Sequence, residues 1–291
     1  MHEFWIQSDD VDQGYRNIRD GDSEFLRERL QSLWDRFSCY LDNDFRQDFA
    51  RKPDNRFWEF YICQRLIENR KSLVRMNGRS KDGPDFLVED VGGRVWIEAV
   101  TFEHGSDANP DRVPELVYDG KIRKVPVAEV ELRISQAFDV KSKKVKKYIE
   151  GGLVNRDDRV LIAINPARVA AQSSEQGRGS PFCVLYPFGD LQQDFLAGQP
   201  YGPSYFRHRL YIERKSGASV EIGMFASAKH QHISGVIWSR ATIQNFYFGK
   251  RPLVYYPNSQ PTNSLNPNWM NWDLEWSVSL DRSGNFIISP L

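Results

Sequence analysis

Two short stretches decide the fold: GPDFLV at residues 83–88 and VWIEAV at residues 95–100, joined through a VGG turn at residues 91–93. Each stretch is mostly apolar, contains aromatic and β-branched residues, and lies next to glycine, a composition typical of strands. The pattern therefore predicts a hairpin with strands near residues 85–89 and 94–102.

Each strand of this hairpin carries an acid that is a candidate site residue. Side chains alternate along a strand, so Glu98 shares a mostly apolar face with Trp96 and Val100. Asp85 opens the preceding strand and is expected to lie near Glu98 across the hairpin. Two converging carboxylates form the hard-oxygen site that Mg²⁺ or Mn²⁺ prefers. The simpler alternative is a pair of ordinary strand-end acids that face water.

Helices are predicted before and after the hairpin. Hydrophobic periodicity and terminal signals favour helices over residues 23–49, 55–70 and 127–150, and the last one meets a stop signal at Gly151-Gly152. A continuous apolar run, VLIAI at residues 160–164, predicts a strand that is buried on both faces. The order helix, hairpin, helix and buried strand predicts an α/β fold with a mixed central β-sheet flanked by helices.

The chain divides into three parts by pattern. Residues 1–52 predict a helical segment, residues 53–165 hold the α/β core, and residues 166–291 predict a β-rich portion packed on that core. In the last part, residues 169–181 are expected to form an exposed loop and residues 257–272 a turn-rich stretch. Four strands are predicted there, at residues 182–187, 209–213, 219–225 and 233–239.

Composition fits a globular protein without excess charge. The 291 residues include 39 Lys and Arg against 39 Asp and Glu, so any contact with a polyanion needs a local basic patch. Three widely spaced cysteines without a CxxC pair favour a reducing cytosol over a disulfide framework or a zinc site. Because neither a signal peptide nor a long apolar run is evident, we expect a cytoplasmic protein without a membrane partner.

Two charged residues fall on the apolar faces of the predicted helices. On a helical wheel, Glu59 lies in the same arc as Leu66, and Lys141 lies between Val130 and Ile134. A charge that faces a core is costly unless it is paired or binds a metal ion. The alternative is that both side chains extend to the edge of the core or pair with structural partners.

These acids fit a known pattern. Pro84-Asp85, twelve further residues and then Glu98-Ala99-Val100 resemble the PD-(D/E)XK nuclease superfamily, and the upstream helical acid Glu59 suits that pattern. Shorter matches resemble a group of uncharacterised bacterial proteins of this type: FWE at 57–59, GPDF at 83–86, WIEAV at 96–100, Leu132-Arg133 with Lys141, and IAIN at 162–165.

The resemblance implies a restriction-endonuclease-like core and a catalytic metal site. Asp85 and Glu98 would bind Mg²⁺ or Mn²⁺, joined by the Ala99 carbonyl and by Glu59. The implied activity is endonucleolytic hydrolysis of phosphodiester bonds, with DNA favoured as substrate, in restriction, repair or defence against foreign DNA.

One position departs from the family. The lysine that follows the glutamate by two residues in the family is Val100 here. That lysine orients or activates the attacking water. Its absence therefore leaves a second hypothesis, a catalytically inactive module that binds nucleic acid or a protein. Some members place an equivalent lysine on a neighbouring helix, for which Lys141 is the first candidate and Arg133 the second.

The helix at 127–150 also offers a basic face. Arg133, Lys143, Lys144 and Lys147 are candidate contacts for the phosphate backbone of DNA. The alternative is a solvated face, which the zero net charge favours. A homodimer is a further assembly to test.

Two weaker features complete the sequence. His230 and His232 could share a metal ion, but a pair without a third ligand is more often surface. Trp269, Trp272 and Trp276 could stack on bases, although a packed C-terminal layer is the favoured interpretation.

Overall fold

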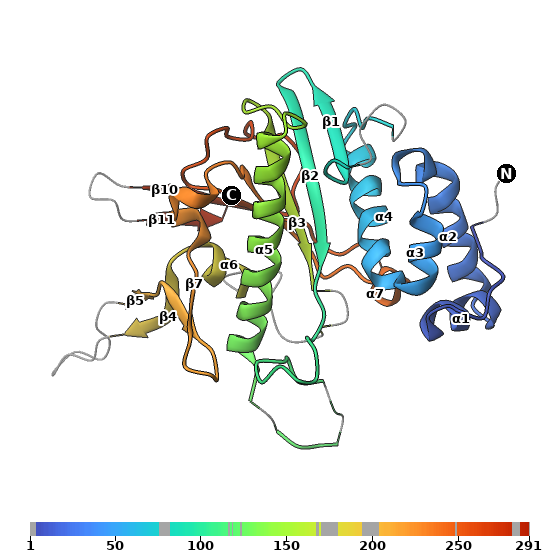
Figure 1. Cartoon of the computed structure of the whole chain (residues 1–291), viewed down its shortest axis with the longest axis horizontal. Coiled ribbons are helices and arrows are strands. Elements are labelled where there is room, and N and C mark those ends of the chain that lie inside the picture. The colour runs from blue at the N-terminus through green and yellow to red at the C-terminus, as the bar shows by residue number, and fades with distance from the viewer. Residues whose placement is uncertain are drawn as a thin grey trace.

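A computed structural model gives the fold of the chain, apart from residues 1–3, 76–81, 116, 118, 123, 167–168, 170–179, 194–203, 248, 281–285 and 291. Helices lie on both faces of one central sheet (Figure 1). The mixed α/β class predicted from the sequence is therefore confirmed.

The sheet has the order β1-β2-β3-β8-β9-β10, and β11 extends it to seven strands through β10. Strands β2, β3 and β8 run parallel, while β1 is antiparallel to β2 and β9 is antiparallel to β8. The strand bounds are β1 Phe86–Asp90, β2 Gly93–Thr101, β3 Arg159–Asn165, β8 Gly235–Trp238, β9 Val254–Pro257, β10 Leu274–Leu280 and β11 Phe286–Pro290. The predicted hairpin and the buried strand are confirmed to within two residues.

Two long helices cover opposite faces of the sheet (Figure 1): α4 (Pro53–Glu68) and α5 (Val127–Glu150). The alternation of side chains along β3 divides the core, because Leu161 and Ala163 join the α4 side while Ile162 joins the α5 side. Trp58 of α4 is fixed to the sheet by a 2.9 Å hydrogen bond from its Nε1 to the Ala163 carbonyl.

The predicted helix at 23–49 is wrong as a single element. It is divided into α2 (Glu24–Phe37), the 3₁₀ turn η1 (Ser38–Tyr40) and α3 (Phe45–Arg51). After this break, Phe45 packs edge-on against Phe60 of α4, with ring centroids 4.6 Å apart. Tertiary packing of aromatic rings therefore overrides a continuous helical pattern. The first helix, α1 (Gln13–Asp20), lies beside α2 and α3 (Figure 1).

Residues beyond 165 contribute to the central sheet itself, because β8 to β11 come from this portion. The predicted strand at 182–187 is wrong: these residues lie largely in helix α6 (Ser180–Leu185), whose buried side chains pack against the α5 side of the core. Most of the predicted loop at 169–181 lies outside the described residues. The smaller elements are β4 Phe188–Gln193, β5 Ser204–His208, β6 Tyr211–Glu213, β7 Ser219–Glu221, η3 Met224–Ala226, η4 Ala228–His230 and α7 Ile243–Tyr247.

The cysteines and the helix lengths bear on the environment of the chain. No disulfide joins Cys39, Cys63 and Cys183, all of which lie in the described part of the chain. Among the described residues, no helix has the length and apolarity needed to cross a bilayer.

Candidate active site

The site lies at the end of β2 that extends beyond its pairing with β1. Strand β1 begins at Phe86, which pairs with Ile97, so residues 98–101 of β2 extend past the paired segment. Asp85 takes up the next position, and its Oδ2 accepts a 2.6 Å hydrogen bond from the Ala99 N–H. The N–H and C=O of one strand residue point to the same side, so the Ala99 carbonyl also faces this open edge.

Glu98 is fully buried on the α5 side of β2, with none of its side chain exposed. Its Oε1 accepts hydrogen bonds from Lys141 Nζ at 2.5 Å and from Lys144 Nζ at 2.8 Å. Its Oε2 is equally buried and has no hydrogen-bond partner among the residues that the structure describes. One oxygen of this carboxylate therefore accepts hydrogen bonds from two lysines, and the other oxygen accepts none from the described residues.

The charges at this edge influence one another. Burial and the nearby charge of Glu98 raise the pKa of Asp85, while Lys141 and the Ala99 N–H act in the opposite direction. Burial alone would lower the pKa of Lys144, but the charge of Glu98 and its hydrogen bond raise that pKa above the ordinary value. Two carboxylates close enough to repel, with lysines beside them, form one electrostatic unit.

Glu59 approaches from α4, on the other face of the sheet. It forms a 2.8 Å ion pair with Arg56, which lies one helical turn earlier and also pairs with Asp42 and Asp48. Burial, and after it the charge of Asp85, raise the pKa of Glu59 to about 8 despite the guanidinium. The charge of Asp85 thus affects the pKa of Glu59, but the hydrogen bond of Glu59 is to Arg56.

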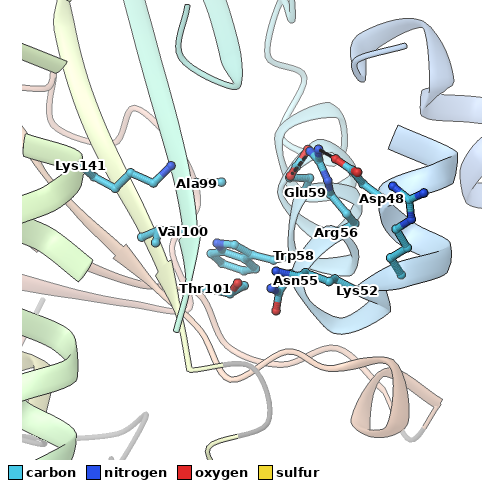
Figure 2. A pocket seen from close by; sticks show the side chains of 11 residues that line it. Asp48, Lys52, Asn55, Arg56, Trp58, Glu59, Ala99, Val100, Thr101 and Lys141 are labelled. Atoms are coloured by element: carbon cyan, nitrogen blue, oxygen red, sulfur yellow. Dashed lines mark hydrogen bonds and ion pairs between the residues drawn. The ribbon is translucent and has the colours of Figure 1, made fainter. Parts of the chain in front are cut away.

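A cleft of about 510 Å³ opens at the uncovered edge of β2. Figure 2 shows Lys141 reaching this edge from α5 and the side chains of α4 facing it from the opposite side. The lining residues are Ala99, Val100 and Thr101 of β2, Lys141 of α5, Asn55, Arg56, Trp58 and Glu59 of α4, and Asp48, Arg51 and Lys52 at the α3–α4 junction.

The structure brings together four of the predicted site residues. Asp85, Glu98, Ala99 and Lys141 meet around one end of β2. Ala99, Lys141 and Glu59 line the cleft, whereas Asp85 and Glu98 are not among its lining residues. Within the described part of the chain, no group of three or more His, Cys, Asp or Glu side chains lies close enough to hold a metal ion on its own. Any ion at this edge would therefore need the backbone, water or substrate as additional ligands.

The predicted DNA-contacting residues on α5 have different environments. Arg133 donates to the Glu103 carbonyl and to Gln136, Lys143 pairs with Asp139 at 2.6 Å, and Lys147 is exposed. Lys144 pairs with Glu98, a contact that the sequence analysis missed. Its position three residues after Lys141, on the same side of the helix, was the available signal.

The weaker candidates lie away from this edge. His230 Nδ1 and His232 Nε2 lie 2.8 Å and 3.2 Å from the hydroxyl of Ser142, and burial lowers the pKa of His230 to about 4. Trp269 and Trp276 are buried in the core, as expected for a packed C-terminal layer.

Comparisons with protein-family models, with curated proteins and with solved structures found no match to this chain.

Proposed function

We propose that this protein is a divalent-metal-dependent endonuclease that hydrolyses phosphodiester bonds of DNA at the open edge of β2. The observation that carries the proposal is Glu98, a fully buried carboxylate with one oxygen held by two lysines and the other without a partner. Leaving a buried charged oxygen unsatisfied is costly, and a bound ion or a catalytic role is one explanation for it.

The residues present fit a hard divalent cation. Mg²⁺ is usually held by one or two carboxylates, with water and substrate phosphates completing its six ligands. Asp85, the unpartnered Glu98 Oε2 and the Ala99 carbonyl would supply the protein ligands. Burial and the repulsion of Glu98 raise the pKa of Asp85, and such an ion would offset that repulsion. When bound, Mg²⁺ or Mn²⁺ supplies a Lewis acid for the phosphoryl oxygens and a more acidic water.

The chain's own groups would orient the reaction. Lys141 lines the cleft while it contacts Glu98, so its ammonium is positioned to stabilise negative charge that develops on a phosphate there. Lys144 contacts the same oxygen and fixes the orientation of Glu98. These two lysines take the place of the family's lysine at the position that Val100 occupies.

A second function is favoured by the same ion pairs. Two lysines on one carboxylate could stabilise Glu98 without any metal ion, in which case the chain would bind nucleic acid or a protein and not cleave. Titration with Mn²⁺ by calorimetry separates the two functions. Saturable binding that is lost in Glu98→Gln supports the enzyme, and absence of binding supports the inactive module.

The decisive experiment is incubation of DNA with the protein and Mg²⁺ or Mn²⁺. We expect cleavage that falls by at least about 10²-fold in Asp85→Asn and in Glu98→Gln, since each removes a charge at the reacting centre. Glu131→Gln is the matched control, because Glu131 is also a buried, ion-paired acid but pairs with Arg209 away from the cleft. Cleavage that persists in both site variants would exclude this site.

Lys141→Ala adds a finer test. The variant should lose rate and keep its affinity for Mn²⁺, because Lys144 remains on Glu98 while the ammonium that lines the cleft is removed. A variant that loses metal affinity and rate together would assign Lys141 a structural role only.

A further inference from the structure

The walls of the cleft carry an excess of positive charge. Its lining includes the four cations Arg51, Lys52, Arg56 and Lys141, against the two carboxylates Asp48 and Glu59. The chain as a whole has no net charge, so the excess is local. The local positive charge would therefore attract a polyanion to this cleft, although the molecule as a whole would not.

Most of these charges are already compensated. Arg56 binds both Asp48 and Glu59, and Lys141 binds Glu98. Arg51 and Lys52 differ, because both side chains are exposed and neither makes an ion pair or a side-chain hydrogen bond to any residue that the structure describes.

Local backbone geometry explains why two neighbouring cations project here. Helix α3 ends at Arg51, and Lys52 leaves the helical conformation at φ −141° and ψ 68° before Pro53 begins α4. The turn thus places Arg51 and Lys52 beside the first turn of α4, the end of the helix dipole that carries partial positive charge. Asn55 of that first turn also lines the cleft.

We propose that Arg51 and Lys52 bind phosphates of the substrate strand that flank the bond to be cleaved. This inference rests on the proposed nuclease function and names a backbone-binding wall for it. Lys141 lies on the opposite side of the β2 edge (Figure 2), so a strand lying along that edge would contact Lys141 at the reacting phosphate and the α3–α4 junction at its neighbours. Such phosphate contacts position a strand without reading its sequence.

The sequence had placed the phosphate contacts on α5 instead. There Lys143 is paired with Asp139 and Lys144 with Glu98, so the charge available for a phosphate is reduced. Binding of phosphates at the α3–α4 junction and binding on α5 therefore predict opposite effects of variants that remove charge from each surface.

The test is fluorescence anisotropy with a labelled DNA oligonucleotide, single-stranded and as a duplex, in EDTA between about 50 and 200 mM NaCl. For Arg51→Ala/Lys52→Ala, the log–log slope of affinity against salt should fall by roughly 1.4 on single strands and 1.8 on duplex, for two lost phosphate contacts. Lys143→Ala/Lys147→Ala, which removes the same charge from α5, should leave the slope within about 0.5 of the wild type. Circular dichroism melting confirms that each variant is folded.

The results separate this inference from the proposed function. A reduced slope without any DNA cleavage would retain the phosphate-binding wall and reject the nuclease. Cleavage together with an unchanged slope in Arg51→Ala/Lys52→Ala would retain the nuclease and reject the phosphate-binding wall. A wild-type protein that binds neither oligonucleotide, or an α5 variant that alone loses the slope, would overturn the inference.

Discussion

Two carboxylates on opposite sides of one sheet, the fully buried Glu98 and the half-buried Glu59, are stabilised in different ways. Glu59 in α4 is paired with Arg56, one turn earlier on the same helix, and that arginine is shared with two further acids. Glu98 in β2 is paired with Lys141 and Lys144, which lie 43 and 46 residues further along the chain, and its second oxygen is unpartnered.

This difference indicates that Glu98, and not Glu59, is the acid with an oxygen left for a ligand. A local pair on one helix satisfies Glu59 whether or not anything occupies the cleft. The pairs on Glu98 depend on the packing of α5 against the sheet and still leave one oxygen unsatisfied, which is the arrangement expected of a binding site.

The largest effect is expected when both lysines on Glu98 are removed. Lys141→Ala/Lys144→Ala leaves a buried carboxylate without a cation and should lower the free energy of unfolding by about 3–5 kcal/mol. Each single variant should lose only about 1 kcal/mol, because the other lysine still pairs with Glu98. Urea unfolding of the wild type, the two single variants and the double variant measures the coupling energy between the two lysines. Additive single losses would show that the lysines act independently of Glu98.

A smaller loss is expected on the other side of the sheet. Arg56→Ala should cost about 1–3 kcal/mol, because Asp42 and Asp48 are partly exposed and water can replace the guanidinium there. Glu59 can also take up a proton, since its pKa is already raised to about 8. The same urea experiment checks this, and a loss larger than that of the double lysine variant would reverse the comparison.

The protonation of Glu59 gives a pH dependence. Its pKa in the folded protein, about 8, lies above its ordinary value of 4.5, so the folded state binds more protons between these values. The contribution of Glu59 is therefore fully favourable below about pH 4.5 and is lost as the pH rises through about 8. Relative to Glu59→Gln, the wild type should lose up to about 1.4 kcal/mol per pH unit in this window, measured in EDTA. A constant difference would contradict the raised pKa.

The smallest effect is expected from the exposed lysines of α5. Lys143→Ala/Lys147→Ala should change stability by less than about 1 kcal/mol, because the Lys143–Asp139 pair is at the surface. Thermal unfolding checks this. A larger loss would mean that the basic face of α5 contributes to the fold, and this variant would no longer serve as a neutral control.

Much of the fold could be predicted from periodicity alone. The helix at 127–150 was predicted with its observed bounds, and the hairpin was placed within two residues. These elements have strong amphipathic patterns and clear turn signals, which act over a few residues. The break between α2 and α3 and the helix α6 were missed, because aromatic packing and burial against distant elements decide them.

The candidate site divides in the same way. The sequence indicated Glu98, Glu59 and Lys141 as charges within apolar stripes, and Asp85 as the acid that opens the preceding strand. It missed Arg51 and Lys52, because exposed cations at a helix junction have no pattern until the β2 edge is placed opposite them.

By itself, the sequence determined that two strand acids and an inward-facing lysine exist, because alternation and helical periodicity fix the direction of each side chain. Only the tertiary structure decided that Lys144 joins Lys141 on one oxygen of Glu98, that Glu59 is paired with Arg56, and that the cleft lies beyond the end of β1. Distances between groups far apart in the chain depend on how whole elements pack, and no local pattern encodes them.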